Sequence, residues 1–508
     1  MMGLAAALLG WLMAHTAIFS PDGLRYIAQA QRIERGAWVD GLFRSVDHPV
    51  YPLAIAAGHR QFGGERPEDW QDAAQAASVV AGILLVVPLY LVALELFGPR
   101  AAWLGVALIY AVPLSAHVFA DVLSESTFLL FWSWGLWTAL RFLKQGRFGW
   151  LPPTIGFSAL AYLSRPEGLL LPAALVATLL LIPLLRSTRL NWPRWWAAVG
   201  VLVLGPACLV GPYIVAKGGL GTKPAIQRLL GTAPHSAPDA VERQRPLDPN
   251  QSTARTYALA VKAMFEAVRD ATTTPLLALS VLGIAGCRPF TPRARTWLFL
   301  AIIAVASVLA LVRLHATGGY CSPRHAMVLA MLLIPAGAAG LDLALRTITI
   351  PGRWIGQGEA RFRPGPAVWV ATLGGFLAWS VPQVLTPINH EFAGYRGASR
   401  YLREHVPAGE KVADVTGWTL YYERRPGYTF GNLIEAPHDP KLRWVVVREA
   451  HLRGPWTYCA QLRALVQGLE PLATFPEQPT AGQALVYVFD RQARPAATAQ
   501  SPPAAVRR

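Results

Sequence analysis

The chain consists largely of apolar stretches of about 17 to 25 residues, separated by short polar connections. An α-helix of that length crosses a hydrocarbon core of about 30 Å. Only 15% of the 508 residues are charged, whereas a soluble protein would carry about 25%. The sequence therefore predicts a mainly α, polytopic helical membrane protein.

About eleven such runs can be counted. They lie at residues 3–19, 73–97, 101–119, 124–143, 150–164, 168–185, 195–215, 273–290, 296–314, 325–345 and 367–385. The first run lacks a basic leader, so we interpret it as a retained span rather than a signal peptide. The runs between residues 101 and 143, and those between 150 and 185, follow each other closely. A missed or merged span in either place would change the count.

The distribution of Lys and Arg predicts the orientation in the membrane. With the N-terminus inside, cationic connections such as the one containing Lys144 and Arg147 fall on the cytoplasmic side, as the positive-inside rule requires. An odd number of spans then places the C-terminal region outside. We expect a multi-pass protein of the plasma (inner) membrane, with its active site and C-terminal domain extracytoplasmic.

Several functional classes are disfavoured. The net charge of +16 is spread over short loops, without the basic cluster that a nucleic-acid partner requires. No glycine-rich phosphate loop stands between a strand and a helix, and His and Asp are too dispersed for a metal site, so we expect no cofactor and no metal. Four cysteines are too few for a disulfide scaffold, although Cys321 and Cys459 could form one bridge.

The predicted organisation is a membrane domain, residues 1–385, with large exterior loops at 20–72 and 216–272. A soluble α/β domain follows at 386–490, because strand-like and helix-like segments alternate there. Residues 491–508 read as a disordered tail. In the first loop, helical spacing of apolar residues after Ser20-Pro21 predicts a helix in the membrane interface, and residues 48–62 a second one.

Charged residues gather at the exterior ends of the spans, where a buried or interfacial charge is most informative. Asp22 could act as a general base toward an acceptor hydroxyl, or it could simply favour the helix N-terminus. Arg165 and the pair Arg324-His325 could grip a lipid phosphate or anchor the chain to anionic headgroups. Glu125 could bind a substrate or cap a helix.

Several short motifs together resemble a known family. The pattern ProAspGlyLeuArgTyrIleAla at residues 21–28, followed by HisProValTyrProLeu from His48, resembles the first exterior loop of GT-C integral-membrane glycosyltransferases. LeuSerGluSer around Glu125, LeuSerArgProGluGly around Arg165 and ProArgHisAlaMet from Pro323 support it in order. The likeness covers about residues 1–345 and is greatest to protein O-mannosyltransferases and the lipid A aminoarabinose transferase.

The resemblance implies a polyprenyl-phosphate-sugar donor and a glycan, lipid or protein acceptor, with transfer on the exterior face. It implies that Asp22 is the base and that Arg165 and Arg324 hold phosphate. Further substrate-binding candidates are His325, Glu125, Asp121, Tyr26 and His48. Many mannosyltransferases carry two adjacent acids in this loop, whereas Gly23 follows Asp22 here, which favours an inverting, metal-independent site with one carboxylate.

Two other classes stay open. A transporter or flippase for lipid-linked saccharides predicts polar residues at the membrane midplane and broken helices in matched halves. A non-catalytic scaffold predicts that the charge of Asp22 is dispensable.

Overall fold

The computed structural model of the chain describes residues 1–184, 191–221, 227, 252–286, 294–347, 350–351, 361–362 and 366–493. These residues form two compact units. The first unit comprises Met1–Thr16 and the described residues between Arg25 and Ile388, and the second comprises Ala17–Leu24 and the described residues from Asn389 onward. The predicted disordered tail lies outside the described residues from position 494.

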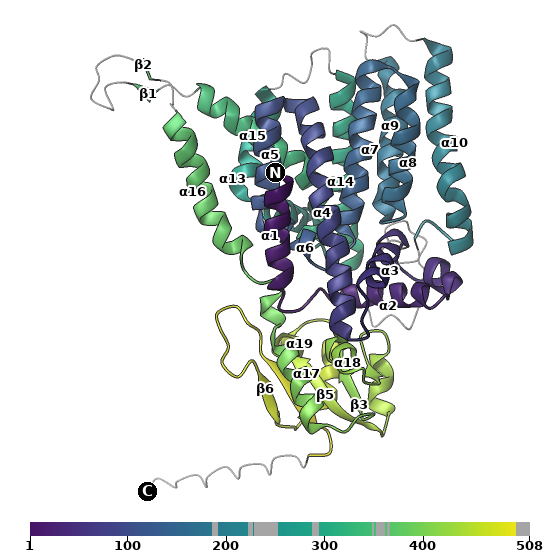
Figure 1. Ribbon diagram of the computed structural model, residues 1–508, viewed down its shortest axis with the longest axis vertical. Coiled ribbons are helices and arrows are strands. Elements are labelled where there is room, and N and C mark those ends of the chain that lie inside the picture. The colour runs from purple at the N-terminus through teal and green to yellow at the C-terminus, as the bar shows by residue number, and fades with distance from the viewer. Residues whose placement is uncertain are drawn as a thin grey trace. The chain divides into compact units, whose positions relative to one another are not determined.

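The chain up to residue 388 is almost entirely helical (Figure 1). The helices are α1 (Met2–Ala14), α2 (Asp22–Glu34), η1 (Asp40–Arg44), α3 (Val50–Phe62), α4 (Pro67–Phe97), α5 (Pro99–Ala111), α6 (Pro113–Ala120), α7 (Glu125–Gln145), η2 (Phe148–Trp150), α8 (Leu151–Tyr162), η3 (Pro166–Leu169), α9 (Leu170–Leu181), η4 (Ile182–Leu184), α10 (Trp192–Lys217), α12 (Thr253–Thr272), α13 (Thr274–Gly286), α14 (Ala294–Gly318), η5 (Pro323–Ala326), α15 (Met327–Thr347) and α16 (Pro366–Val384). A two-residue antiparallel pair, β1 (Ile350–Pro351) with β2 (Arg361–Phe362), precedes α16. The predicted mainly α fold class is confirmed.

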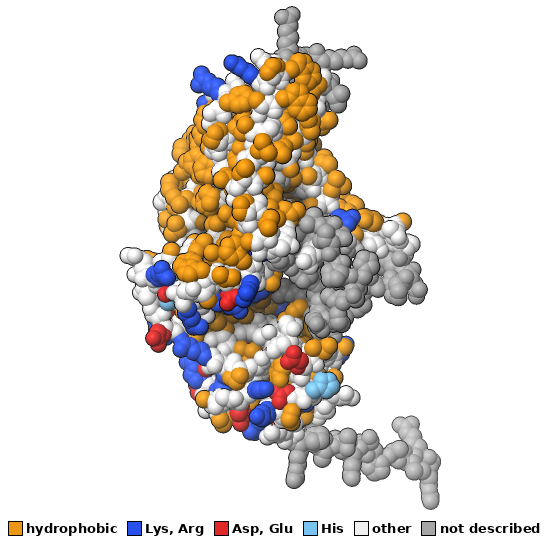
Figure 2. Space-filling view, turned by 90° about the vertical axis from the view of Figure 1, so that its right-hand side faces the viewer, with side chains coloured by type: hydrophobic (Ala, Val, Ile, Leu, Met, Phe, Trp, Pro, Cys, Tyr) orange, Lys and Arg blue, Asp and Glu red, His pale blue; other side chains and the backbone are white. Residues whose placement is uncertain are grey.

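Four described helical segments are long and apolar enough to cross a membrane unbroken, namely α4, α10, α14 and η5–α15. The bent pair α5–α6 is apolar and long enough only when its two helices are taken together, as a broken span or a re-entrant loop, and several shorter apolar helices accompany these segments. Hydrophobic side chains cover most of the face of the helical unit visible in Figure 2. Large exposed side chains such as Trp103, Leu204 and Leu309 match a lipid-facing surface. The number of about eleven spans stays a prediction.

A sharp bend separates α5 from α6, two helices that the sequence presents as one apolar run. The helices meet at an angle of 71°. Pro113 has no backbone N–H to continue α5, and it drives the preceding Val112 into an extended conformation with ψ 121°. Helix α6 ends at Ala120, and the chain turns through residues 121–124 before α7 begins at Glu125.

Buried polar side chains on α4 hold this turn in place. Gln75 is fully buried, and its Nε2 donates to Ala120 O at 2.9 Å and to Thr16 Oγ1 at 2.7 Å. Ser78 Oγ donates to Leu123 O at 3.1 Å and also contacts the hydroxyl of Tyr51 at 2.8 Å. Because these carbonyls follow a helix end, they need partners away from water. The α4 helix supplies them, and so fixes the residues that precede Glu125.

Helices α13 and α15 pack at unusually close range through glycines. A Cβ atom on Gly283 would overlap the carbonyl oxygen of Ala336, and one on Gly340 would overlap that of Leu279. Small residues of this kind let two membrane helices approach with their backbones in contact. The close packing secures α15, the helix that follows Arg324 and His325.

We expect Gly340→Leu to lower the stability of the first unit by about 1–3 kcal/mol, because the side chain must push the two helices apart. The measurement is thermal unfolding of the purified protein in detergent. Gly374→Leu is the matched control, since a Cβ at that position of α16 meets open space. Equal unfolding temperatures for the two variants would contradict this account of the packing.

The second unit is a small α/β domain, as the sequence predicted. Its sheet has the order β4-β3-β5-β7-β6, with β3 parallel to β4 and β5, and β7 antiparallel to β5 and β6. The strands are β3 (Lys411–Asp414), β4 (Gly427–Tyr428), β5 (Leu442–Arg448), β6 (Ala473–Phe475) and β7 (Val486–Asp490), and the helices are η7 (His390–Phe392), α17 (Gly394–His405), α18 (Trp418–Glu423), η8 (Leu433–His438), α19 (Glu449–Arg453) and α20 (Thr457–Val466). Val445, Val447 and Leu462 lie in its core.

The short segment Ala17–Leu24 also belongs to this unit. Trp418 Nε1 donates to Phe19 O at 3.0 Å, and Asn389 Nδ2 donates to Ile18 O at 2.9 Å. Cys321, in the first unit, and Cys459, in the second, are both free thiols in the structure.

Candidate active site

Helix α2 carries the proposed base and begins at that residue, Asp22. Tyr26, Ile27, Ala30 and Ile33 are buried along one face, which is the amphipathic pattern that the sequence indicated. Asp22 itself is only 8% exposed. It belongs to the second unit, whereas the helix from Arg25 onward belongs to the first.

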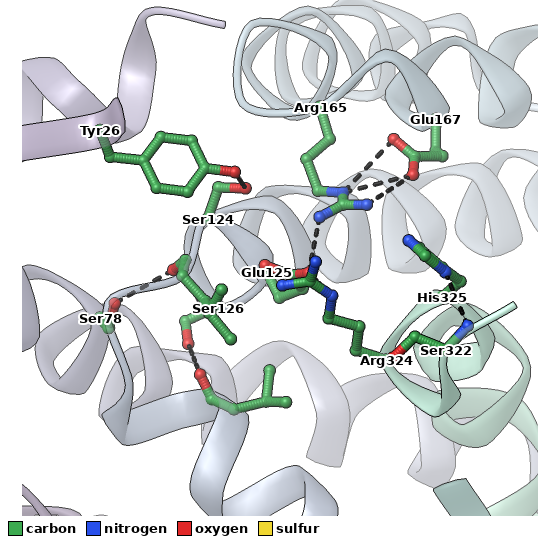
Figure 3. A network of polar contacts seen from close by, with 12 residues as sticks. Tyr26, Ser78, Ser124, Glu125, Ser126, Arg165, Glu167, Ser322, Arg324 and His325 are labelled. Carbon is green, nitrogen blue, oxygen red and sulfur yellow. Dashed lines mark hydrogen bonds and ion pairs between the residues drawn. The ribbon is translucent and has the colours of Figure 1, made fainter. Parts of the chain in front are cut away.

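Tyr26, one turn after Asp22, connects α2 to the turn before α7. Its hydroxyl contacts Ser124 Oγ at 3.0 Å in a buried hydrogen bond, and its ring packs edge-on against Tyr51 at 5.1 Å. Figure 3 shows Tyr26 pointing at Ser124, the residue before Glu125. Because Ser124 directly precedes Glu125, this hydrogen bond brings Tyr26 close to Glu125, another predicted site residue.

Glu125 lies between two arginines from distant parts of the chain (Figure 3). Arg165 Nη1 is 2.7 Å and Arg324 Nε is 4.0 Å from Glu125 Oε1. The glutamate side chain is 3% exposed, and the two arginines are 15% and 18% exposed. Within the described residues, neither carboxylate oxygen makes a hydrogen bond of good geometry. Glu125 can therefore still accept hydrogen bonds from a ligand hydroxyl.

The two arginines differ in their distance from acidic side chains. Arg165 is gripped by a second acid as well, with Nη2 donating to Glu167 Oε1 at 2.8 Å. Arg324 approaches Glu125 only at 4.0 Å, beyond hydrogen-bond range. Arg165 thus pairs with two acids, Glu125 and Glu167, through one guanidinium.

Two further candidates, His325 and Asp121, make hydrogen bonds to nearby backbone N–H groups. His325 lies in η5 beside Arg324, and its Nδ1 accepts a hydrogen bond from the backbone N–H of Ser322 at 3.2 Å. Asp121 is 5% exposed, and its Oδ1 accepts from Val122 N at 2.7 Å at the end of α6. Both side chains shape the local backbone. Within the described ranges, no three His, Cys, Asp or Glu side chains are grouped so that they could hold a metal ion.

A second buried cluster, which sequence reasoning did not find, lies around Asp47. Its Oδ2 accepts from Arg25 Nε of α2 at 3.0 Å. Its backbone carbonyl accepts from Lys217 Nζ at 2.8 Å, and Lys217 also donates to Tyr213 Oη at 2.9 Å. Lys217 is only 5% exposed at the last residue of α10. A lysine that ends an apolar run normally indicates an interfacial anchor, so no sequence pattern indicated this contact.

His48 belongs to this Asp47 cluster and not to the glutamate–arginine network. The ring is 3% exposed and lies edge-on to Tyr162 at 4.9 Å and tilted against Tyr213 at 5.9 Å. Val50 N also donates to Leu163 O at 3.0 Å, which ties the loop to the end of α8, just before Arg165. The cluster thus fixes α2 and the first loop against α8 and α10.

Comparisons with known proteins agree with this architecture. The model of the family described as dolichyl-phosphate-mannose-protein mannosyltransferase matches residues 47–209, a stretch that contains Glu125 and Arg165. No curated protein matches the sequence significantly.

Two solved structures share the fold. ArnT from Cupriavidus metallidurans, in a crystal structure with undecaprenyl phosphate bound, matches with a TM-score of 0.57 and 16% identity, over 97% of this chain and 98% of ArnT. The archaeal oligosaccharyltransferase AglB from Archaeoglobus fulgidus, in complex with an inhibitory peptide and a dolichol-phosphate, matches with a TM-score of 0.59 and 12% identity, over 90% of this chain and 70% of AglB.

At these identities the likeness establishes the fold. The chain is a polytopic membrane protein with the GT-C glycosyltransferase fold. This is the fold that the sequence motifs led us to expect.

We expect Glu125→Gln to destabilise the first unit by about 3–5 kcal/mol, because it leaves Arg165 buried with one acid fewer. Thermal unfolding in detergent measures the effect. Glu95→Gln is the control, since Glu95 also pairs with two cations, Arg141 and Lys144, but on α4. A smaller loss for Glu125→Gln than for the control would argue against a tightly paired buried network.

Lys217→Met should cost about 1–3 kcal/mol, because the buried carbonyl of Asp47 loses its charged donor. We also expect faster protease cleavage of loop 20–72, which the contact holds. Lys262→Met is the control, since Lys262 lies 72% exposed on α12. If the two variants are cleaved at the same rate, Lys217 does not secure the loop.

Proposed function

We propose that this protein is a glycosyltransferase that moves a sugar from a polyprenyl-phosphate donor to a hydroxyl of a glycan, lipid or protein on the extracytoplasmic face. The observation that carries the proposal is the buried network of Glu125, Arg165 and Arg324 at the ends of apolar helices. It combines a cation suited to a lipid phosphate with a carboxylate suited to sugar hydroxyls. The bound lipid phosphates of ArnT and AglB support the same donor class.

In the proposed reaction, Arg324 holds the phosphate of the donor, and Arg165 keeps Glu125 oriented. Glu125 accepts hydrogen bonds from hydroxyls of the sugar. Asp22 takes the proton from the acceptor hydroxyl as its oxygen bonds to the anomeric carbon. The bond from that carbon to the phosphate oxygen breaks, and its electron pair leaves with the polyprenyl phosphate. One displacement of this kind inverts the configuration of the sugar.

A single substitution at Asp22 separates the two interpretations of this residue. Asn can still accept backbone hydrogen bonds at a helix N-terminus, but it cannot accept a proton at neutral pH. We expect Asp22→Asn to reduce transfer from a synthetic polyprenyl-phosphate sugar by about 100- to 10,000-fold, with donor binding unchanged. Asp40→Asn, at an acid of the same loop that pairs with Arg44, should leave transfer intact. Unchanged transfer by Asp22→Asn would eliminate the proposed base.

The phosphate role is tested separately, by donor binding. Arg324→Gln should weaken binding of a polyprenyl phosphate by about tenfold or more, because a charge-assisted contact is lost. Arg255→Gln changes the same charge on the exposed start of α12 and should have no effect. Equal donor affinities in the two variants would remove Arg324 from the site.

The main alternative is a flippase for lipid-linked saccharides. It predicts that lipid-linked sugar accumulates on the inner leaflet in membranes without the protein, and that Asp22→Asn is without effect on that distribution. The glycosyltransferase predicts accumulation on the outer leaflet, where the unused donor would remain.

A further inference from the structure

The second unit contains a cluster of polar side chains at the carboxyl ends of its parallel strands. The chain leaves β3 for β4 on one flank, and then passes back to form β5 on the other flank of β3. After β5 the chain continues to β6, which lies beyond β7 on the far side of β5. The connections that leave the carboxyl ends of β3 and β5 therefore run in opposite directions, near Asp414 and Arg448. In open α/β sheets, this is the place where ligands bind. Figure 1 shows β3 and β5 side by side, with α17, α18 and α19 at the same sheet.

Arg448, the last residue of β5, is a cation that lacks a matching anion. Its Nε is buried without a hydrogen bond, and its Nη2 approaches His451 Nε2 at 3.4 Å, a long contact. The guanidinium stacks over the ring of Phe392 at 4.7 Å. No ion pair involves Arg448 within the described residues. The side chain is half-buried, so solvent and solutes can still reach it.

The acids nearest in sequence and in the sheet are committed elsewhere. Asp414 accepts four hydrogen bonds, from the backbone N–H and the hydroxyl of both Thr416 and Thr419, at 2.6–2.9 Å. Glu449 pairs with Arg453 at 2.7 Å. A partly buried guanidinium without a counterion is unfavourable, and stacking on Phe392 offsets only part of that cost.

Aromatic hydroxyl groups accompany this arginine. Tyr395 is fully buried, and its burial, together with the charge of Asp414, raises the pKa of its phenol. It therefore remains a neutral hydroxyl at all physiological pH values. The ring of Tyr458 lies edge-on to His451 at 5.6 Å. The cluster thus contains a cation, an imidazole and phenols, a combination rich in hydrogen-bond donors.

We propose that Arg448 and His451, at the carboxyl ends of β3 and β5, form a binding site for the phosphate group of a phosphorylated ligand. A guanidinium presents planar, paired N–H donors to phosphate oxygens, and the imidazole next to it can supply another. The phosphate could belong to a soluble sugar phosphate or to a lipid headgroup. The site lies within the second unit and does not depend on the transfer reaction proposed for the first.

The experiment measures binding to the full-length protein in detergent with two probes, glucose 1-phosphate and phosphatidic acid. All variants carry Arg324→Gln, which removes the proposed phosphate ligand of the first unit. On that background, Arg448→Gln should weaken binding of at least one probe by about tenfold. Arg400→Gln, at an exposed position of α17, should change binding less than about twofold. A loss confined to glucose 1-phosphate identifies a soluble ligand, and one confined to phosphatidic acid identifies a headgroup.

Binding of both probes with the same affinity after Arg448→Gln would overturn the proposal. So would an equal loss after Arg400→Gln, because that result indicates general surface charge. If Arg448→Gln lowers the unfolding temperature, Arg448→Lys replaces it, since Lys keeps the charge but not the paired donors. We then expect a loss of about threefold or more, and unchanged binding would equally overturn the site.

Discussion

The buried ion pair between Glu125 and Arg165 joins the parts of the first unit on which the candidate site depends. Its 2.7 Å contact connects the start of α7 to the turn between α8 and η3. Charges at this depth persist only when paired, because removing them from water costs several kcal/mol each. The pairing therefore restricts how these helices can pack. A second arginine, Arg324, lies 4.0 Å from the same carboxylate oxygen.

Other buried polar groups of the first unit also need partners, and the surrounding helices supply them. Pro113 ends α5 early, and the freed backbone groups after α6 are satisfied by Gln75 and Ser78 of α4. In the first loop, Lys217 donates to the backbone carbonyl of Asp47, and Arg25 donates to its carboxylate. Polar side chains inside the helical unit thus serve mainly to satisfy irregular backbone at the helix ends. These contacts hold the first loop in its conformation.

The two units deal with charge differently. In the first, Glu125 and Glu167 both pair with Arg165. In the second, Asp414 and Glu449 are engaged by threonines and by Arg453, and Arg448 is left facing His451. The two arrangements use separate sets of residues. Helices of the GT-C fold position the residues of the first proposed site, whereas the strand order of a small sheet positions those of the second.

The sequence by itself determined the mainly α membrane fold, the α/β character of the C-terminal unit and most of the helix positions. Those properties follow from the local length and periodicity of apolar runs, which each segment carries on its own. It also named Glu125, Arg165 and Arg324, through short motifs. Tertiary structure alone decided that these three meet, that α5 and α6 bend apart, and that Lys217 reaches Asp47 across 170 residues. Contacts between distant segments depend on how helices pack, and no local pattern encodes that packing.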